Sequence, residues 1–346
     1  MLCVIRSRVA LVALLAVVLA VGAAVTAGNA AAAPARSDAV VVLGDSAASG
    51  EGAGDYAPGT RGEGGDWCHR SPHAYIYAAR LAPVAIDLAC SGAGAADVAV
   101  GGSHYGETAQ STQLAGVARR YRVTTVVVQV GANDAAALVD TGIACIRAFL
   151  DVLVPPCRQT LGPLVPRRMA ATATAVEKAV GDVRAAMRAA GYADAGWRLV
   201  LASYAAPITE RMVPLQALHG CPYSKPDAQW GRTVLFPALS DTLRGVAART
   251  GAAFLDLDRA TEGREACAHE NAAQDWQRRV TVDPHALAFG GLDAAGFHIA
   301  QESFHPTAAA HAAIGQCLAA FVRSGAATGA CVPGAGATLT LRPSRV

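Results

Sequence analysis

A serine that could act as a nucleophile stands close to the start of the chain. Ser46 lies in the segment VVLGDSAASGEG, where the apolar run Ala39–Leu43 ends in a Gly-Asp-Ser turn. A nucleophilic serine needs a base to take its proton, a group that orients the base, and donors that stabilise the oxyanion. A Gly-Asp-Ser turn by itself is common, and its aspartate can simply cap the next helix. The significance of Ser46 therefore depends on the other components being present elsewhere in the chain.

Three further blocks offer those components. Gly92 lies in LACSGAGAAD, Asn133 in VVVQVGANDAA and His305 in ESFHPTAAAH. Taken singly, they can be a tight turn, a helix N-cap and a structural histidine beside a proline turn. His305 is favoured over His298 and His311 because it combines a His-Pro turn with a position just ahead of a predicted C-terminal helix. The four blocks together predict one shared site.

The four blocks, in this order, resemble those of the SGNH, or GDSL-type, serine hydrolases, and the resemblance spans roughly residues 38–320. It implies that Ser46 is the nucleophile and that His305 is the general base and then the general acid. It also implies an oxyanion hole made by the backbone N–H groups of Ser46 and Gly92 and the side-chain amide of Asn133. The implied activity is carboxylic ester hydrolysis through an acyl-enzyme, with no cofactor and no metal.

The group that orients His305 has three candidates. The family usually places an aspartate three residues before the histidine, and this chain has Glu302 there. We expect its carboxylate to accept the proton on the far imidazole nitrogen. The longer side chain could miss that nitrogen, and the backbone carbonyl of Glu302 would then take its place, as a carbonyl does in some secreted relatives. Asp256 or Asp258 is the third candidate; as a metal site this pair is weak, because it lacks further ligands.

The elements that must position these residues alternate along the chain. Five apolar runs predict strands buried on both faces, and helical stretches separate them. The predicted strands are Ala39–Leu43, Val84–Ala89, Thr124–Val130, Arg198–Ala202 and Ala253–Leu257, and the predicted helices are Tyr75–Leu81, Thr112–Tyr121, Ala170–Ala190, Pro237–Thr250 and Thr307–Ser324. This alternation predicts an α/β fold, a flavodoxin-like three-layer sandwich with a five-stranded parallel sheet. Ser46, Gly92 and Asn133 then fall at the carboxyl ends of strands, where such sheets bind ligands.

Two long segments of weak periodicity, Ala205–Gly231 and Asp258–Ser303, predict the walls of the pocket. They and their surroundings contain aromatic residues that we expect to form an apolar rim for an acyl group, with the alternative that one or two of them belong to the core. These residues are Trp230, Phe236, Trp276, Phe297 and Phe304. The same family site serves lipases, phospholipases and carbohydrate acetylesterases. A catalytically silent binding protein on this scaffold is the alternative from another class, and the intact Ser46, Asn133 and His305 argue against it.

The N-terminus reads as a secretory signal. Arg6 and Arg8 precede the apolar stretch Ala10–Ala27, and small residues suited to cleavage follow it. We expect residues 1–35 to be a signal peptide, residues 36–346 to form a single domain, and the mature protein to be extracellular. A retained anchor is the alternative that the apolar length permits, but we expect no stable membrane anchor after cleavage.

Cysteine usage agrees with export. The chain has nine cysteines, and setting Cys3 of the leader aside leaves an even number, which favours disulfides over free thiols or zinc. Sequence alone leaves the pairing open. Resemblance to secreted actinobacterial esterases and lipases of this family implies three neighbour-to-neighbour bridges, to which we add a fourth by extension. The expected bridges are Cys68–Cys90, Cys145–Cys157, Cys221–Cys267 and, by extension, Cys317–Cys331.

Charge excludes some classes of partner. The formal net charge is +2 and no basic run is present, so neither nucleic acid nor an anionic surface is implied. We expect a monomer that acts on a small-molecule or lipid ester.

Overall fold

Five parallel strands form the centre of the sheet at the predicted positions. They are β1 (Asp38–Gly44), β2 (Val84–Asp87), β5 (Arg122–Gln129), β6 (Arg198–Ala202) and β7 (Ala253–Asp256). Their order in the sheet is β2-β1-β5-β6-β7, and every neighbouring pair is parallel. Most residues of β1, β5 and β6 are buried, as expected for strands that helices cover on both faces. The α/β prediction is confirmed.

The sheet has seven strands rather than the five expected. β8 (Thr328–Pro333) adds to β7 in parallel, and β9 (Leu339–Arg342) closes this edge antiparallel to β8. These strands were missed because they are partly exposed and lack the long continuous hydrophobic run by which the central strands were recognised.

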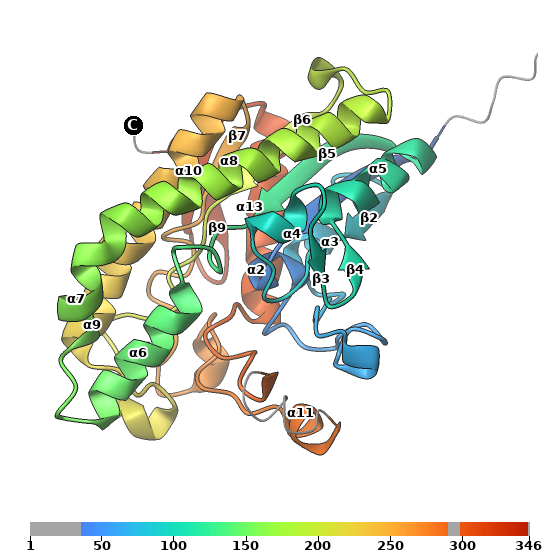
Figure 1. Cartoon of the computed structure of the whole chain (residues 1–346). Coiled ribbons are helices and arrows are strands. Elements are labelled where there is room, and N and C mark those ends of the chain that lie inside the picture. Colours follow the sequence, from blue (N-terminus) through green and yellow to red (C-terminus); the bar gives the residue numbers. More distant parts are fainter. Residues whose placement is uncertain (1–35, 290–297, 345–346) are drawn as a thin grey trace, which may run out of the picture. The chain divides into compact units, whose positions relative to one another are not determined.

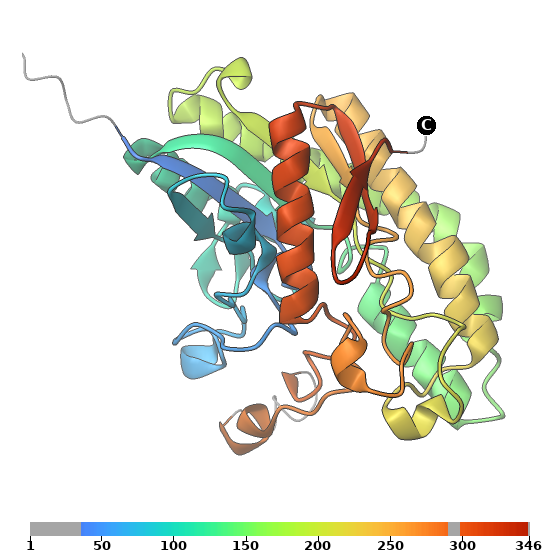
Figure 2. The same cartoon turned by 180° about the vertical axis from the view of Figure 1, so that it is seen from behind.

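Helices cover both faces of this sheet (Figures 1 and 2). One core lies beneath α5 (Gln110–Arg120), α8 (Val165–Ala189) and α10 (Phe236–Thr250). The core on the other face lies beneath α3 (Tyr75–Ala79) and α13 (Ala308–Ser324). All five predicted helices are present, with ends displaced by a few residues. Because helices cover both faces of the sheet, the edge at which the parallel strands end is the part that remains open for a site.

Shorter elements complete the chain. The remaining helices are α2 (Ser46–Ser49), α4 (Ala95–Val98), α6 (Leu138–Leu150), α7 (Cys157–Leu161), α9 (Lys225–Trp230) and α11 (Pro284–Phe289). A hairpin joins β3 (Ser103–His104) to β4 (Glu107–Thr108). Single 3-10 turns are η1 (Glu63–Gly65), η2 (Gly162–Leu164), η3 (Asp194–Gly196), η4 (Gln216–His219) and η6 (Ala272–Gln274), and η5 (Gly231–Leu235) is a π-helical turn.

The computed structural model describes residues 36–289 and 298–344. All the elements above belong to one compact unit, Ser37–Val346. The predicted signal peptide and Phe297 lie outside the described residues. Within the part of the chain that is described, no helix has both the length and the apolar character to cross a membrane.

The cysteines are paired as expected. The four bridges are Cys68–Cys90, Cys145–Cys157, Cys221–Cys267 and Cys317–Cys331. The third joins the two long segments that sequence analysis predicted as pocket walls. Around it and Cys145–Cys157 lies a small separate core. These irregular segments therefore depend on disulfides and local packing rather than on the sheet.

A close approach of two strands fixes the turn that leads to Ser46. Gly44, the last residue of β1, has a φ of 144°, and a Cβ placed on it would lie 1.9 Å from the carbonyl oxygen of Gln129 on β5. The Gln110 side chain accepts from the Gly44 N–H at 2.7 Å and donates to its carbonyl at 2.8 Å. Only glycine fits here, because any side chain would separate β1 from β5.

Gly44→Ala should destabilise the protein by about 3–5 kcal/mol, since it combines backbone strain with a steric clash at the centre of the sheet. Chemical denaturation of the purified variant measures this. The matched control is Gly181→Ala in α8, where an added Cβ meets nothing within 4 Å. That change should stabilise by about 0.5–1 kcal/mol. Equal stabilities of the two variants would contradict the steric account.

Candidate active site

Ser46 begins the short helix α2 immediately after β1. Asp45 is the N-cap residue, and its carboxylate accepts the Ala47 N–H at 3.1 Å. The Tyr204 hydroxyl donates to the other carboxylate oxygen at 2.5 Å. Burial raises the pKa of Asp45 to about 7, against the opposing effect of these hydrogen bonds. Asp45 therefore caps the turn, as expected, while the neighbouring serine is directed out of the sheet edge.

The structure brings His305 to Ser46 across nearly the whole chain. The His305 Nε2 atom lies 2.7 Å from the Ser46 Oγ atom, and Ser46 is 8% exposed. Backbone hydrogen bonds with Arg278 hold the histidine segment: the Arg278 N–H donates to the His305 carbonyl, and the Phe304 N–H donates to the Arg278 carbonyl. Both views place the start of α13, which follows His305, beside α2 (Figures 1 and 2). The predicted nucleophile and base are thus within hydrogen-bonding distance.

The expected role of Glu302 is not what the structure shows. The His305 Nδ1 atom faces the Ser303 carbonyl at 3.1 Å, and the Gln301 carbonyl is a further acceptor nearby. The Glu302 carboxylate instead accepts from the Tyr56 hydroxyl at 2.8 Å, and its carbonyl accepts the His305 backbone N–H. The reason is a turn in the chain: Phe304 has a φ of 61°, which presents the carbonyl two residues before the histidine to its ring.

Asp256, one of the two aspartates considered as the third candidate, is bound elsewhere. Asp256 accepts hydrogen bonds from the hydroxyls of Ser203 and Ser240 and pairs with Arg244 at 2.9 Å. It also accepts the backbone N–H of Asp258. Asp256 thus organises the end of β7. With the proton on Nδ1 held by a carbonyl, Nε2 is left unprotonated and can accept the proton of Ser46.

Gly92 and Asn133 meet at the carboxyl ends of β2 and β5. The Asn133 side-chain amide donates to the Ala93 carbonyl at 3.0 Å, which uses one of its two N–H donors. Gly92 has a φ of 83°, and an added Cβ would lie 3.2 Å from the His104 ring. The Asp134 carboxylate accepts the Ala95 N–H, so it supports this turn structurally. The glycine and asparagine blocks therefore meet at the carboxyl edge of the sheet, and the Cys90 N–H joins the glycine block to Gly44, two residues before Ser46.

Electrostatics favour the neutral form of His305. Removal from water lowers the pKa of the imidazole below its usual 6.5, while the Glu51 carboxylate and the Ser303 carbonyl oppose that effect. A neutral imidazole is the form that can act as a general base.

A polar cluster beside His305 was missed by sequence reasoning. Glu51, His69 and Tyr56 pack together and bond to the segment at Gln301 and Glu302. Glu51 follows Ser46 closely in the GEG sequence, but a charged residue in a glycine-rich loop normally indicates an exposed turn. Its complete burial is visible only in the fold.

The expected aromatic rim is partly wrong. Phe236 belongs to the main core, and Trp276 packs against Ala310 and Ala313 of α13. Trp230 and Phe304 are partly buried against the small disulfide-bonded core, where Phe304 meets the Tyr223 ring edge-on. Phe236 and Trp230 lie in helices α10 and α9, and large aromatic side chains are commonly buried in the core, so their presence in the sequence does not by itself indicate a pocket.

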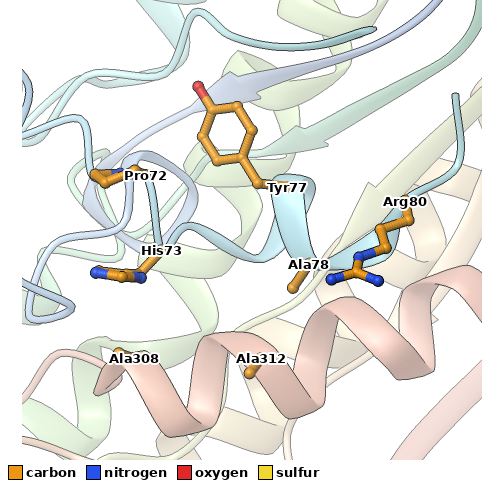
Figure 3. A pocket seen from close by; sticks show the side chains of 7 residues that line it. All are labelled: Pro72, His73, Tyr77, Ala78, Arg80, Ala308 and Ala312. Atoms are coloured by element: carbon orange, nitrogen blue, oxygen red, sulfur yellow. The ribbon is translucent and has the colours of Figure 1, made fainter. Parts of the chain in front are cut away.

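Two open hollows lie near the site without containing the pair. One, of about 290 Å³, is bordered by His73, Tyr77 and Arg80 on the α3 side and by Ala308 and Ala312 of α13 (Figure 3). The other, of about 350 Å³, lies between α4 and α8 and reaches Asp134. In neither case are Ser46 and His305 among the described lining residues.

Comparison with known proteins agrees with this geometry. The GDSL-like lipase/acylhydrolase family matches residues 42–313, which contain all four blocks. Lipase 1 from Streptomyces coelicolor is 40% identical over 134 residues, covering 37% of this chain and 43% of that protein. The chain thus matches less than half the length of this curated relative.

Two solved structures are similar in fold. Phospholipase A1 from Streptomyces albidoflavus has a TM-score of 0.56 and 22% identity, and the match covers 84% of this chain and 100% of that one. An extracellular lipase from Streptomyces rimosus has a TM-score of 0.47 and 21% identity, over 78% of this chain and 93% of that one. The first of these likenesses supports the fold described above.

Glu302→Gln should keep kcat within about five-fold of the wild type, because the amide oxygen can still accept from Tyr56 and the Ser303 carbonyl still holds His305. Steady-state kinetics with a p-nitrophenyl ester measures the change. A loss of several orders of magnitude would restore the Glu302 carboxylate to the role predicted from the sequence.

The pH profile of kcat/KM should retain activity below pH 6.5. His305 must be neutral to accept a proton, and its lowered pKa keeps it neutral to a lower pH than a free histidine. The measurement is the midpoint of the acid limb of the profile for a soluble ester. A midpoint clearly above 6.5 would show that the imidazolium is stabilised in the free enzyme, contrary to the structure.

Proposed function

The chain belongs to the GDSL-like lipase/acylhydrolase family, and from this premise we propose that it is a secreted serine esterase or lipase that hydrolyses carboxylic esters. The observation that carries this proposal is the 2.7 Å contact between the Ser46 hydroxyl and the His305 Nε2 atom at the carboxyl edge of the sheet. Ligands of open parallel sheets bind at this edge.

The reaction proceeds in two steps. The Ser46 Oγ atom attacks the acyl carbon as its proton passes to His305 Nε2, giving a tetrahedral oxyanion. The bond to the leaving alcohol then breaks, and the imidazolium gives that alcohol its proton. Water repeats the sequence on the acyl-enzyme, so that the carboxylic acid leaves and Ser46 recovers its hydroxyl proton.

Neutral donors stabilise the oxyanion in this proposal. They are the backbone N–H groups of Ser46 and Gly92 and the Asn133 N–H that does not bond to Ala93. Fixed neutral donors favour the charge that develops in the transition state without supplying a competing base. The meeting of the Gly92 and Asn133 blocks at the strand ends supports this assignment.

Exposed apolar side chains favour water-insoluble esters as substrates. Helix α6 begins five residues after Asn133 and ends at Leu150, which is 70% exposed, and Val152 and Leu153 in the following loop are 94% and 88% exposed. Leu218 of η4, in the segment joined to the same small core, is 83% exposed. Exposed apolar side chains that form one patch are typical of contact with lipid or with another apolar partner. The lipase activity named for the Streptomyces coelicolor relative points the same way.

Phospholipids and acetylated carbohydrates are the alternative substrates of the same site. Export as an extracellular monomer is part of the proposal, supported by the signal-like N-terminus and the four disulfides. The formal net charge of +2, without a basic run in the sequence, gives no support for a nucleic-acid partner.

Ser46→Ala should lower ester turnover by about 10³-fold or more while the protein stays folded, because the hydroxyl supplies the nucleophile and little packing. A series of p-nitrophenyl esters, a phospholipid and an acetylated sugar provide the assays. Ser103→Ala, at an exposed position of β3, is the matched control and should keep wild-type turnover.

Labelling by a serine-directed phosphonate tests the alternative class. The wild type should be labelled at Ser46 and the Ser46→Ala variant should not. A folded Ser46→Ala variant that still hydrolyses esters would overturn the serine mechanism, and a wild type that resists labelling and hydrolyses nothing would indicate a binding protein.

A further inference from the structure

Glu51 is a fully buried carboxylate that the mechanism above does not use. Its side chain is 0% exposed. One oxygen lies 2.9 Å from His69 Nδ1 and 3.1 Å from the Tyr56 hydroxyl, and the other accepts from Gln301 Nε2 at 2.8 Å. A buried ionised carboxylate is unfavourable unless such donors compensate its loss of water. Its presence here therefore calls for a role.

The position of Glu51 is fixed against the segment that carries His305. A Cβ added to Gly52, the next residue, would lie 2.9 Å from the His305 Cβ atom, so the two backbones touch. The Gly52 carbonyl accepts from Arg278 Nε at 2.7 Å, and the Gly52 N–H donates to Tyr56. The residue after Glu51 thus packs against the backbone of His305, and several hydrogen bonds hold this turn in place.

The chemistry creates a need for negative charge at this place. In each step of the proposed reaction His305 becomes an imidazolium while partly removed from water. The acceptor that the structure places at its Nδ1 atom is a neutral carbonyl rather than the carboxylate of a typical triad. A neutral carbonyl orients the ring, but it stabilises the cation less than an anion does.

We propose that Glu51 is a positioning residue that supplies this missing negative charge to the His305 imidazolium from behind, without touching its Nδ1 atom. This inference rests on the proposed function. Burial would raise the pKa of Glu51, but its pairing with His69 and its other contacts lower it to about 2, so the carboxylate is ionised at working pH. Glu51 in turn raises the pKa of His305, against the lowering that burial causes.

His69 is the second fully buried member of this cluster. Its Nδ1 atom lies 2.9 Å from the Glu51 carboxylate, while its buried Nε2 atom has no hydrogen-bond partner among the residues described. The hydrogen bond between Nδ1 and the carboxylate helps to compensate the burial of Glu51.

Other groups near His305 differ from Glu51 in charge or exposure. Glu302 is only partly buried, and Arg278 and His311 bring no negative charge. Among the described residues, the titratable and charged groups that interact with His305 or Glu51 include His69, Tyr56, Tyr105, Arg278, Glu302 and His311. Glu51 is therefore the fully buried anion of this set.

The test is Glu51→Gln, which keeps an acceptor oxygen and removes the charge. We expect kcat for a p-nitrophenyl ester to fall by about 10–100-fold with little change in KM, because the lost stabilisation belongs to the cationic state of His305. The acid limb of kcat/KM should move to lower pH, since the imidazolium loses its counter-charge. Glu302→Gln is the matched control: it removes the other carboxylate bonded to Tyr56 and should move neither quantity as far.

A folded Glu51→Gln enzyme with the wild-type kcat and an unmoved acid limb would overturn the inference. So would a loss of kcat with an unmoved limb, because that result indicates a purely structural role. Thermal unfolding monitored by circular dichroism shows whether the variant is folded.

Tyr56→Phe separates charge from anchoring, and it stands alone if Glu51→Gln does not fold. It removes the hydroxyl that links Glu51 to Glu302 but keeps the Glu51 charge. We expect kcat within a few-fold of wild type and an acid limb that does not move to lower pH. A loss as large as that predicted for Glu51→Gln would show that the hydrogen-bonded anchor, not the charge, is what matters. The Ser46→Ala variant keeps the two proposals apart: if it is inactive while Glu51→Gln is normal, only the role of Glu51 fails.

Discussion

The contact between Ser46 and His305 depends on a fold that brings together two segments far apart in the sequence. Their separation in sequence is 259 residues, and the atoms lie 2.7 Å apart. On one side, the close approach of Gly44 to Gln129 directs the serine out of the sheet edge. On the other side, the histidine precedes α13, whose apolar face belongs to the second core. The parallel sheet is therefore the frame that brings the two residues together, because the segment before Ser46 is one of its strands and the helix after His305 packs on it.

The histidine segment is held by polar contacts rather than by regular structure. Arg278 exchanges backbone hydrogen bonds with the residues around His305 and binds the Gly52 carbonyl through its side chain. Gln301 and Glu302 attach the same segment to Glu51 and Tyr56. Buried polar networks of this kind specify one arrangement when every member is satisfied, since breaking one bond leaves a buried group unpaired. This specificity is what a general base requires, because a displacement of about 1 Å can cost roughly 10²-fold in rate.

Disulfide bridges stabilise the segments that lie outside the two layered cores. Cys221–Cys267 closes a loop of 46 residues in sequence, and Cys145–Cys157 ties α6 to α7. Such bridges commonly stabilise by about 2–4 kcal/mol. The small core around them touches Phe304, next to the histidine, and also supports the segments that expose Leu150 and Leu218. One lobe thus contacts both the histidine segment and the exposed apolar side chains on which the proposal of a lipid-like substrate rests.

Much of the molecule could be predicted from residue types and their order. The buried strands were predictable because parallel strands covered on both faces are continuously apolar, and Ser46, Gly92 and Asn133 each follow such a run. The disulfides followed from the resemblance to a family, since spacing alone leaves their pairing open. Strands β8 and β9 were not predictable in this way, because a half-exposed edge strand carries no such run.

Only the tertiary structure decided what surrounds His305. Counting three residues back from the histidine indicated Glu302, but the φ of 61° at Phe304 presents the Ser303 carbonyl to the ring instead. Glu302 is bound by Tyr56, which is 246 residues away in sequence. Hydrophobic periodicity indicates whether each side chain lies in the core or faces solvent. The partner of a polar atom depends instead on local backbone dihedrals and on segments that meet only after folding, so the role of Glu51 could not be seen in the sequence.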